Sequence, residues 1–279
     1  MADELTKRNF IASTVCACCT AAAGRAYAEM PAASTGRFGK AGLPTMLELG
    51  TQPMQRLSET VWVARIAPGF WVHTTTAAIA GGYVFPANGL LLERVGGSLL
   101  IDTGYTPAQA LDLVQWSKTS LAAPITKAVG THFHNDRIGG VAGLRKLGIR
   151  TYAFQLTVTL AKQHAQPAPE PIAGFTSGTY RLDDDCELFF PGAGHTRDNI
   201  VVWFPRQKIL FGGCFLKSST SASLGNVADA VVPAWASSID RLVARYQPFR
   251  YIIPGHGTMD GDPIAQTRAL LAKAGTKRG

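Results

Sequence analysis

The fold is decided by the stretch Thr131-His132-Phe133-His134-Asn135-Asp136-Arg137 of this 279-residue chain. A strand predicted at residues 128–131 runs into it, and a helix expected over residues 139–147 follows it. Two imidazoles and a carboxylate thus stand at alternate positions just beyond a strand. Both groups are natural zinc ligands, and a catalytic zinc usually keeps about three protein ligands and one open position for water. The stretch therefore predicts a metal site.

Three further segments place a ligand at the same kind of strand end. Gly194-His195-Thr196 and Gly255-His256-Gly257 put histidines on glycine-rich turns, and Gly213-Cys214 ends another apolar run with a thiol. Glycine permits tight turns and close backbone approach. A lone His or Cys is more often a packing residue. Together, however, these segments predict one shared metal site with four of the six histidines: His132, His134, His195 and His256.

The other histidines and cysteines lack this setting. His73 and His164 are expected to be ordinary, with His73 on a strand surface. Cys186 lies in a strand-like run, where a free cysteine is more often a small buried hydrophobe. A disulfide between Cys186 and Cys214 is the alternative for an exported protein.

The N-terminus predicts export. Lys7 and Arg8 form a basic head, residues 10–24 a weakly apolar middle, and Ala26-Tyr27-Ala28 a small-x-small cleavage site. We expect a signal peptide at residues 1–28, then a single periplasmic domain at 29–279 whose residues 29–55 are a partly disordered lead-in. The segment at residues 6–11 also resembles a twin-arginine signal with Lys in the first basic place.

Charge and hydropathy exclude some functions. The formal charge is +8, and without residues 1–28 it is 24 minus 17, or +7. Lys and Arg are scattered, without a basic run or a nucleic-acid motif, so we expect no nucleic-acid partner. The charge favours small anionic substrates or merely solubility. No run reaches the roughly 18 apolar residues of a membrane-spanning helix, so no stable membrane anchor is expected.

Strands and helices alternate along the chain. Residues 60–104 are β-rich, with a hairpin signal at Gly96-Gly97, and Thr106-Pro107 begins a helix expected to reach about residue 121. The second half has a similar layout, with helices near residues 235–246 and from Pro263. Residues 42–50 and 163–171 are the expected mobile loops. The pattern predicts an α/β fold whose sheets are covered by helices on their outer faces.

The run His132-Phe-His134-Asn-Asp136, with His195, Cys214 and His256 in that order, resembles the metallo-β-lactamase superfamily over nearly all of the mature chain. The resemblance implies an αβ/βα sandwich of two similar halves. Arg137 stands where other branches carry a second His, and Cys214 where they commonly carry a bridging Asp. Both match the broad-spectrum, di-zinc subclass B-one.

Carried over residue by residue, this resemblance implies two Zn²⁺ ions per chain. The first would be held by His132, His134 and His195, and the second by Asp136, Cys214 and His256. A metal lowers the pKa of bound water toward roughly 7, so a hydroxide is present at neutral pH without a protein base. The implied reaction is attack of that hydroxide on a β-lactam carbonyl.

The resemblance also assigns roles to residues around the metals. Lys217, three positions after the cysteine, would hold the substrate carboxylate, and Asn226 would donate to the developing oxyanion. Asp136 would orient the reactants, with Asp102 and Arg137 beneath the metals. Two alternatives stay open: Lys217 as a solvated surface lysine and Gly225-Asn226 as an ordinary turn.

The implied function is hydrolysis of penicillins, cephalosporins and carbapenems by a monomeric enzyme, conferring antibiotic resistance. Because fold and metals do not set the substrate, the alternative is a di-zinc hydrolase of lactones or thioesters. A zinc-binding protein without turnover is a third possibility. Residues 79–85 stand where this family has a flexible hairpin over the site, and a plain turn is the other interpretation.

Overall fold

Two mixed sheets carry the elements expected from the sequence. The computed structural model describes residues 54–78 and 84–276. The first sheet has the order β1-β2-β3-β4-β5-β6-β7-β8 and consists of β1 (Gln55–Ser58), β2 (Val61–Ala67), β3 (Phe70–Ala78), β4 (Val84–Leu92), β5 (Ser98–Ile101), β6 (Ile125–Gly130), β7 (Arg150–Ala153) and β8 (Glu170–Pro171). The second has the order β13-β12-β11-β10-β9 and consists of β9 (Gly178–Asp183), β10 (Cys186–Phe190), β11 (Val201–Phe204), β12 (Ile209–Gly213) and β13 (Tyr251–Pro254).

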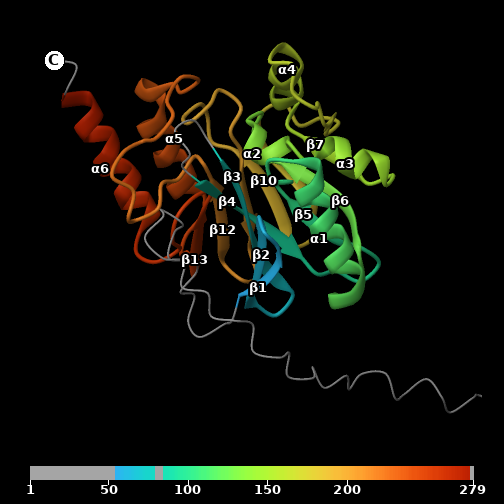
Figure 1. Cartoon of the computed structure of the whole chain (residues 1–279). Coiled ribbons are helices and arrows are strands. Elements are labelled where there is room, and N and C mark those ends of the chain that lie inside the picture. Colours follow the sequence, from blue (N-terminus) through green and yellow to red (C-terminus); the bar gives the residue numbers. More distant parts are fainter. Residues whose placement is uncertain (1–53, 79–83, 277–279) are drawn as a thin grey trace, which may run out of the picture. The chain divides into compact units, whose positions relative to one another are not determined.

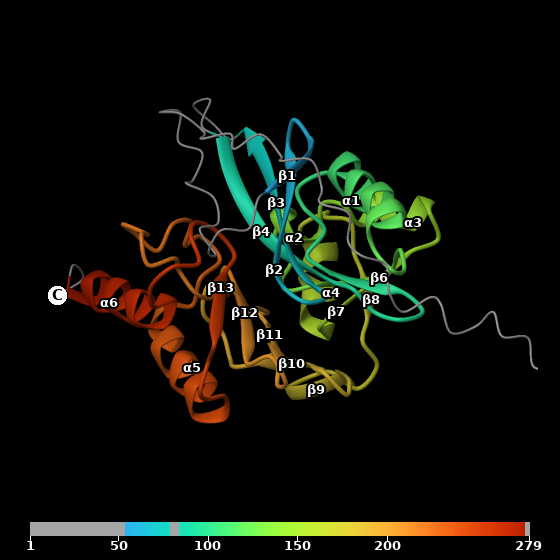
Figure 2. The ribbon, with the colours of Figure 1, turned by 90° about the horizontal axis from the view of Figure 1, so that it is seen from below.

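Helices cover the outer faces of both sheets (Figure 1). They are α1 (Pro107–Ser120), α2 (Asn135–Ile138), α3 (Val141–Lys146), α4 (Gln155–Gln163), α5 (Val232–Arg245) and α6 (Pro263–Thr276). Figure 2 shows α1 and α3 beside the first sheet and α5 and α6 beside the second. This arrangement confirms the predicted αβ/βα sandwich. No helix within the described residues is long and apolar enough to cross a membrane.

Three apolar layers explain the arrangement. The inner faces of both sheets share one cluster, in which Leu90 of β4, Phe204 of β11 and Phe211 of β12 are fully buried. The outer face of the first sheet packs on α1 through residues such as Leu113, and that of the second packs on α5 through residues such as Trp235. Each sheet thus buries both of its faces, and functional side chains are left to the strand ends.

The metal-ligand loop is shaped by glycine contacts. The helix expected over residues 139–147 is α3, which is shorter than expected. The four-residue α2, which the sequence pattern did not predict, precedes it, with Gly139 and Gly140 between the two helices. A Cβ atom at Gly139 would lie 2.2 Å from the carbonyl oxygen of Tyr105, and one at Gly140 would lie 2.5 Å from that of Thr103. The two glycines therefore let this loop press against the segment that follows β5.

Other expectations differ in detail. The sequence pattern missed β1, β9 and α4. It also missed β8, which lies in the segment expected to be a mobile loop and pairs with β7. A strand of two residues is too short to carry a periodic signal. The predicted signal peptide, the loop at residues 42–50 and most of the lead-in lie outside the described residues. So do residues 79–83 of the expected hairpin.

The first turn of α1 allows a test of the predicted cap. The Thr106 hydroxyl accepts the backbone N–H of Gln109 at 3.3 Å, and the Gln109 side chain accepts that of Tyr105 at 2.9 Å. We expect Thr106→Ala to lower the free energy of unfolding by about 1 kcal/mol, measured by urea denaturation. The control is Thr119→Ala, the same chemical change at an exposed position of the last turn, and equal losses would contradict the cap.

Candidate metal centre

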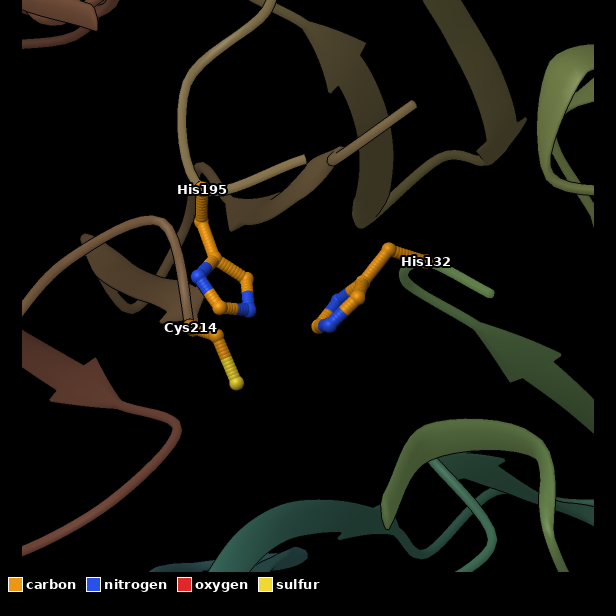
Figure 3. A group of neighbouring side chains, drawn as sticks. All are labelled: His132, His195 and Cys214. Atoms are coloured by element: carbon orange, nitrogen blue, oxygen red, sulfur yellow. The ribbon is translucent and has the colours of Figure 1, made fainter. Parts of the chain in front are cut away.

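The predicted ligands meet at one edge of the two sheets. His132 and His134 follow β6, His195 follows β10, Cys214 follows β12 and His256 follows β13. Strands β10, β12 and β13 run in one direction, because β11 is antiparallel to both β10 and β12, and β13 is parallel to β12. Figure 3 shows His132, His195 and Cys214 pointing into a common space from three separate segments.

Three imidazoles form one part of this centre. The ring centroids of His132, His134 and His195 are 4.8, 5.0 and 5.1 Å apart. Nε2 of His132 and Nδ1 of His195 are buried without a hydrogen-bond partner within the described residues. Burial and the neighbouring imidazoles hold the pKa of His132 well below its usual value, and burial and Lys217 do the same for His195. Neutral rings with unpartnered nitrogens fit a metal cation.

His134 is oriented by a residue that the sequence analysis missed. Its Nε2 lies 2.8 Å from Oδ2 of Asp229. When this carboxylate accepts the Nε2 proton, Nδ1 of His134 remains available to a metal, which is the usual arrangement at histidine-ligated sites. Asp229 had no signal in the sequence, because a single Asp in a turn far along the chain has no characteristic spacing.

Asp136, Cys214 and His256 form the second part. Nε2 of His256 lies 3.0 Å from Sγ of Cys214 and 3.2 Å from Oδ2 of Asp136. Nδ1 of His256 donates to the carbonyl oxygen of Pro86 at 2.7 Å, which turns Nε2 toward the other two groups. One ligand atom from each of these three residues lies within 4.8 Å of the other two. The same holds for the group of His132, His134 and Asp136.

Arg137 lies beneath the second part, fully buried. Its Nη1 donates to Oδ2 of Asp102 at 3.0 Å and to the carbonyl oxygen of Asn88 at 2.6 Å. Its Nη2 lies 2.9 Å from Sγ of Cys214 and 2.8 Å from Oδ2 of Asp136. One guanidinium thereby fixes the distance between the thiol and the carboxylate.

The charges of this part also suit a cation. Burial would raise the pKa of Asp136, but Arg137 and His256 hold it well below its usual range. Burial would lower the pKa of His256, but Cys214 and Asp136 raise it to about 9. With Cys214 as a thiolate and His256 neutral, as a metal-bound imidazole would be, the formal charges of Asp102, Asp136 and Cys214 are −3, and Arg137 adds +1. One divalent cation would cancel the remaining −2.

The structure places Lys217 at the centre, whereas Asn226 makes a local hydrogen bond in its own turn. Lys217 is buried, with Nζ 5.4 Å from the centroid of the Trp235 ring, and its charge acts on the pKa of His195. Asn226 is exposed, and its Oδ1 accepts the backbone N–H of Ala228 at 3.0 Å. This hydrogen bond supports the interpretation of Gly225-Asn226 as an ordinary turn. The catalytic role of Asn226 stays a prediction.

Three expectations about individual residues can be compared with the structure. His73 on a strand surface was wrong, because its side chain is 1% exposed. A strand position is buried when another sheet or a loop packs over it, and the identity of a single residue does not reveal such packing. Cys186 is a free, buried cysteine, as predicted, and it forms no disulfide with Cys214. Phe85, at the end of the expected hairpin, is 42% exposed and packs on the His256 ring at 4.7 Å.

Comparison with known proteins agrees with this geometry. The model of the metallo-beta-lactamase superfamily matches residues 82–256. The chain is 36% identical over 217 residues to a metallo-beta-lactamase type 2 of Bacteroides fragilis, covering 77% of this chain and 86% of the relative. It is 37% identical to a protein of the same name from Bacillus cereus, covering 76% and 83% of the two chains.

Solved structures give the same result. A metallo-β-lactamase of Pseudomonas aeruginosa in its mono-zinc form has a TM-score of 0.73 and 38% identity, covering 78% of this chain and 98% of that one. A metallo-β-lactamase of Erythrobacter litoralis has a TM-score of 0.74 and 34% identity, covering 79% and 99%. With this match in sequence and fold, the chain belongs to the metallo-β-lactamase superfamily.

Proposed function

We propose that this protein hydrolyses the ring amide of β-lactam antibiotics, using two zinc ions per chain, and thereby confers resistance. The observation that carries the proposal is the six-residue ligand set, with Arg137 bridging Cys214 and Asp136 at hydrogen-bond distance. Zinc bound there would act as a Lewis acid and would lower the pKa of a water molecule toward roughly 7. The names of the relatives from Bacteroides fragilis and Bacillus cereus support the same activity.

The proposed ligand sets follow the two parts of the centre. His132, His134 and His195 would hold one ion through neutral imidazoles, with Asp229 orienting His134. Asp136, Cys214 and His256 would hold the other, on the side where negative charge accumulates. Asp136 lies close to both sets, so its carboxylate is placed to orient a reactant between them.

Lys217 gives the centre its preference for an anionic substrate. Its ammonium group has no hydrogen-bond or ion-pair partner within the described residues. Burial lowers the pKa of Lys217, and the sulfur of Cys214 opposes that change. A buried ammonium without a partner attracts a carboxylate strongly, and a β-lactam presents one beside its reactive ring. We propose that Lys217 binds this carboxylate and so orients the ring carbonyl.

We also propose that residues 1–28 direct export and that residues 29–279 act in the periplasm as a monomeric domain. The support is the basic head, the apolar middle and the Ala26-Tyr27-Ala28 cleavage site. A β-lactamase in that compartment would meet its substrate before the substrate reaches the cell-wall enzymes. N-terminal sequencing of the periplasmic protein tests the cleavage site.

Zinc-dependent turnover is the first prediction. The chain purified after export should hydrolyse a chromogenic cephalosporin, lose that activity when a chelator removes the metal, and regain it when zinc is returned. Metal analysis of the same sample should give two zinc ions per chain. Absence of turnover in a sample with two bound ions would favour a lactone or thioester substrate instead.

The second prediction separates the two cysteines. Cys214→Ala should reduce bound zinc from two ions to one and sharply lower turnover, because it removes a ligand of the second part. Cys186 is fully buried in the core between the sheets, where it contacts no predicted ligand. Cys186→Ala should therefore cost some stability but leave zinc content and turnover nearly unchanged. Equal effects on zinc content would contradict the assignment.

The third prediction concerns Lys217. Lys217→Ala should raise KM for a cephalosporin about tenfold or more, because it removes a charge-assisted hydrogen bond to the substrate carboxylate. Lys217→Arg should retain more of the affinity, and Lys162→Ala, at an exposed position of α4, should change nothing. The role fails if the esterified substrate, which lacks the carboxylate, suffers as much from Lys217→Ala as the free acid does.

A further inference from the structure

The buried ring of His73 takes no part in the chemistry described so far. Its Nε2 lies 3.1 Å from the carbonyl oxygen of Ile101 and 3.0 Å from that of Asp102. Because both partners are acceptors, Nε2 carries the proton and donates it. Nδ1 has no hydrogen-bond partner within the described residues. Burial lowers the pKa of His73 to about 4, so the ring is neutral and keeps this single donor near neutral pH.

Gly89 makes room for this contact. His73 of β3 is paired with Gly89 of β4, and β4 lies between β3 and β5, the strand that ends at Ile101. A Cβ atom at Gly89 would lie 2.2 Å from Nε2 of His73 and 2.5 Å from the carbonyl oxygen of Ile101. The imidazole therefore crosses over a neighbouring strand at the one place where that strand has no side chain.

The contact holds a backbone conformation that is unusual for aspartate. Asp102 has a φ of 62°, in the left-handed region, which carries a steric cost for residues with a Cβ atom. Its N–H donates to the carbonyl oxygen of Val129 at 2.8 Å, and its own carbonyl oxygen accepts from His73. The N–H and the carbonyl group of Asp102 are thus both fixed by hydrogen bonds to other strands.

This backbone aims the carboxylate of Asp102 at two groups. Oδ1 accepts the backbone N–H of Thr131 at 2.8 Å, and Oδ2 accepts from Nη1 of Arg137 at 3.0 Å. The other nitrogen of Arg137, Nη2, reaches the thiol and carboxylate of the second part of the centre. Oδ2 also accepts the Thr131 hydroxyl at 3.0 Å, and the carbonyl oxygen of Thr131 accepts the N–H of Ile200 at 2.9 Å. Through Arg137 the Asp102 carboxylate is one side chain away from two ligand atoms of the second part, whereas through Thr131 it acts on the first part only by way of the backbone of the histidine loop.

We propose that His73 is a positioning residue for the second metal ion. By holding the carbonyl oxygens of Ile101 and Asp102, it keeps the Asp102 carboxylate under Arg137. Arg137 in turn keeps Cys214 and Asp136 at the separation that one ion requires. The inference rests on the proposed two-metal function and goes beyond it, because it predicts that a buried residue on β3 affects one ion more than the other.

The test uses two amides of different reach. His73→Gln places an amide nitrogen close to where Nε2 lies, whereas the shorter side chain of His73→Asn cannot reach the two carbonyl oxygens. The affinities of both ions are measured by titrating the metal-free full chain with Co²⁺ against a chelating dye. The thiolate-to-cobalt absorption band reports the ion bound by Cys214. The stability control is Val72→Ala, the neighbouring position, whose side chain is buried in the core between the sheets.

For His73→Asn we expect the dissociation constant of the thiolate-bound ion to rise about tenfold, and that of the other ion to change less than about threefold. His73→Gln should stay within about threefold of the unsubstituted chain for both ions. Val72→Ala should lower the melting temperature without changing either affinity.

Each other outcome has a distinct meaning. Equal behaviour of His73→Asn and His73→Gln would overturn the inference, as would a weakening of both ions that Val72→Ala reproduces. An unsubstituted chain that binds a single Co²⁺ without the thiolate band would instead contradict the two-metal function itself.

Discussion

Arg137 carries a positive charge in a place that water does not reach, and the centre is organised around that charge. Burial alone would lower the pKa of its guanidinium, but Asp136, Cys214 and Asp102 raise it well above the usual value. A buried charge of this kind is tolerated only when opposite charges and acceptors surround it. Nη1 and Nη2 of Arg137 have such partners, whereas its Nε has no hydrogen-bond partner within the described residues. The carboxylates and the thiol that surround Arg137 are therefore required by its burial, and together they leave an excess of negative charge. That excess is what makes a divalent cation a suitable occupant.

The same guanidinium joins the two sheets. It donates to the carbonyl oxygen of Asn88 on β4 and to that of Gly255, just after β13. The backbone N–H of Asn88 also donates to the Gly255 carbonyl oxygen at 2.8 Å. Polar contacts thus connect the sheets at the edge where the ligands lie, and the inner faces of the two sheets share an apolar cluster. Because the fold and the centre share these contacts, ligand geometry depends on correct packing of both halves.

Much of this protein could be predicted from its sequence. His132, His134 and Asp136 could be predicted as candidate metal ligands because they lie close together in the sequence. His195, Cys214 and His256 could be predicted because each follows an apolar run on a glycine-rich turn. Alternating strand and helix patterns predicted sheets covered by helices on their outer faces, and the family resemblance implied the sandwich. Thr106 was predicted from a well-defined cap signal. Elements without a local signal were missed. These include α4, the two-residue β8 and the four-residue α2.

The sequence by itself determined the ligand types, their order along the chain and the cap and turn positions, because these depend on neighbours within a few residues. Only the tertiary structure decided which side chains orient them. Asp229 reaches His134 across 95 positions of the chain, and His73 reaches Asp102 across 29. Neither distance leaves a pattern in the sequence, because such contacts exist only once loops have closed and strands have paired. The burial that makes His73 a fixed donor likewise comes from the packing of the folded chain.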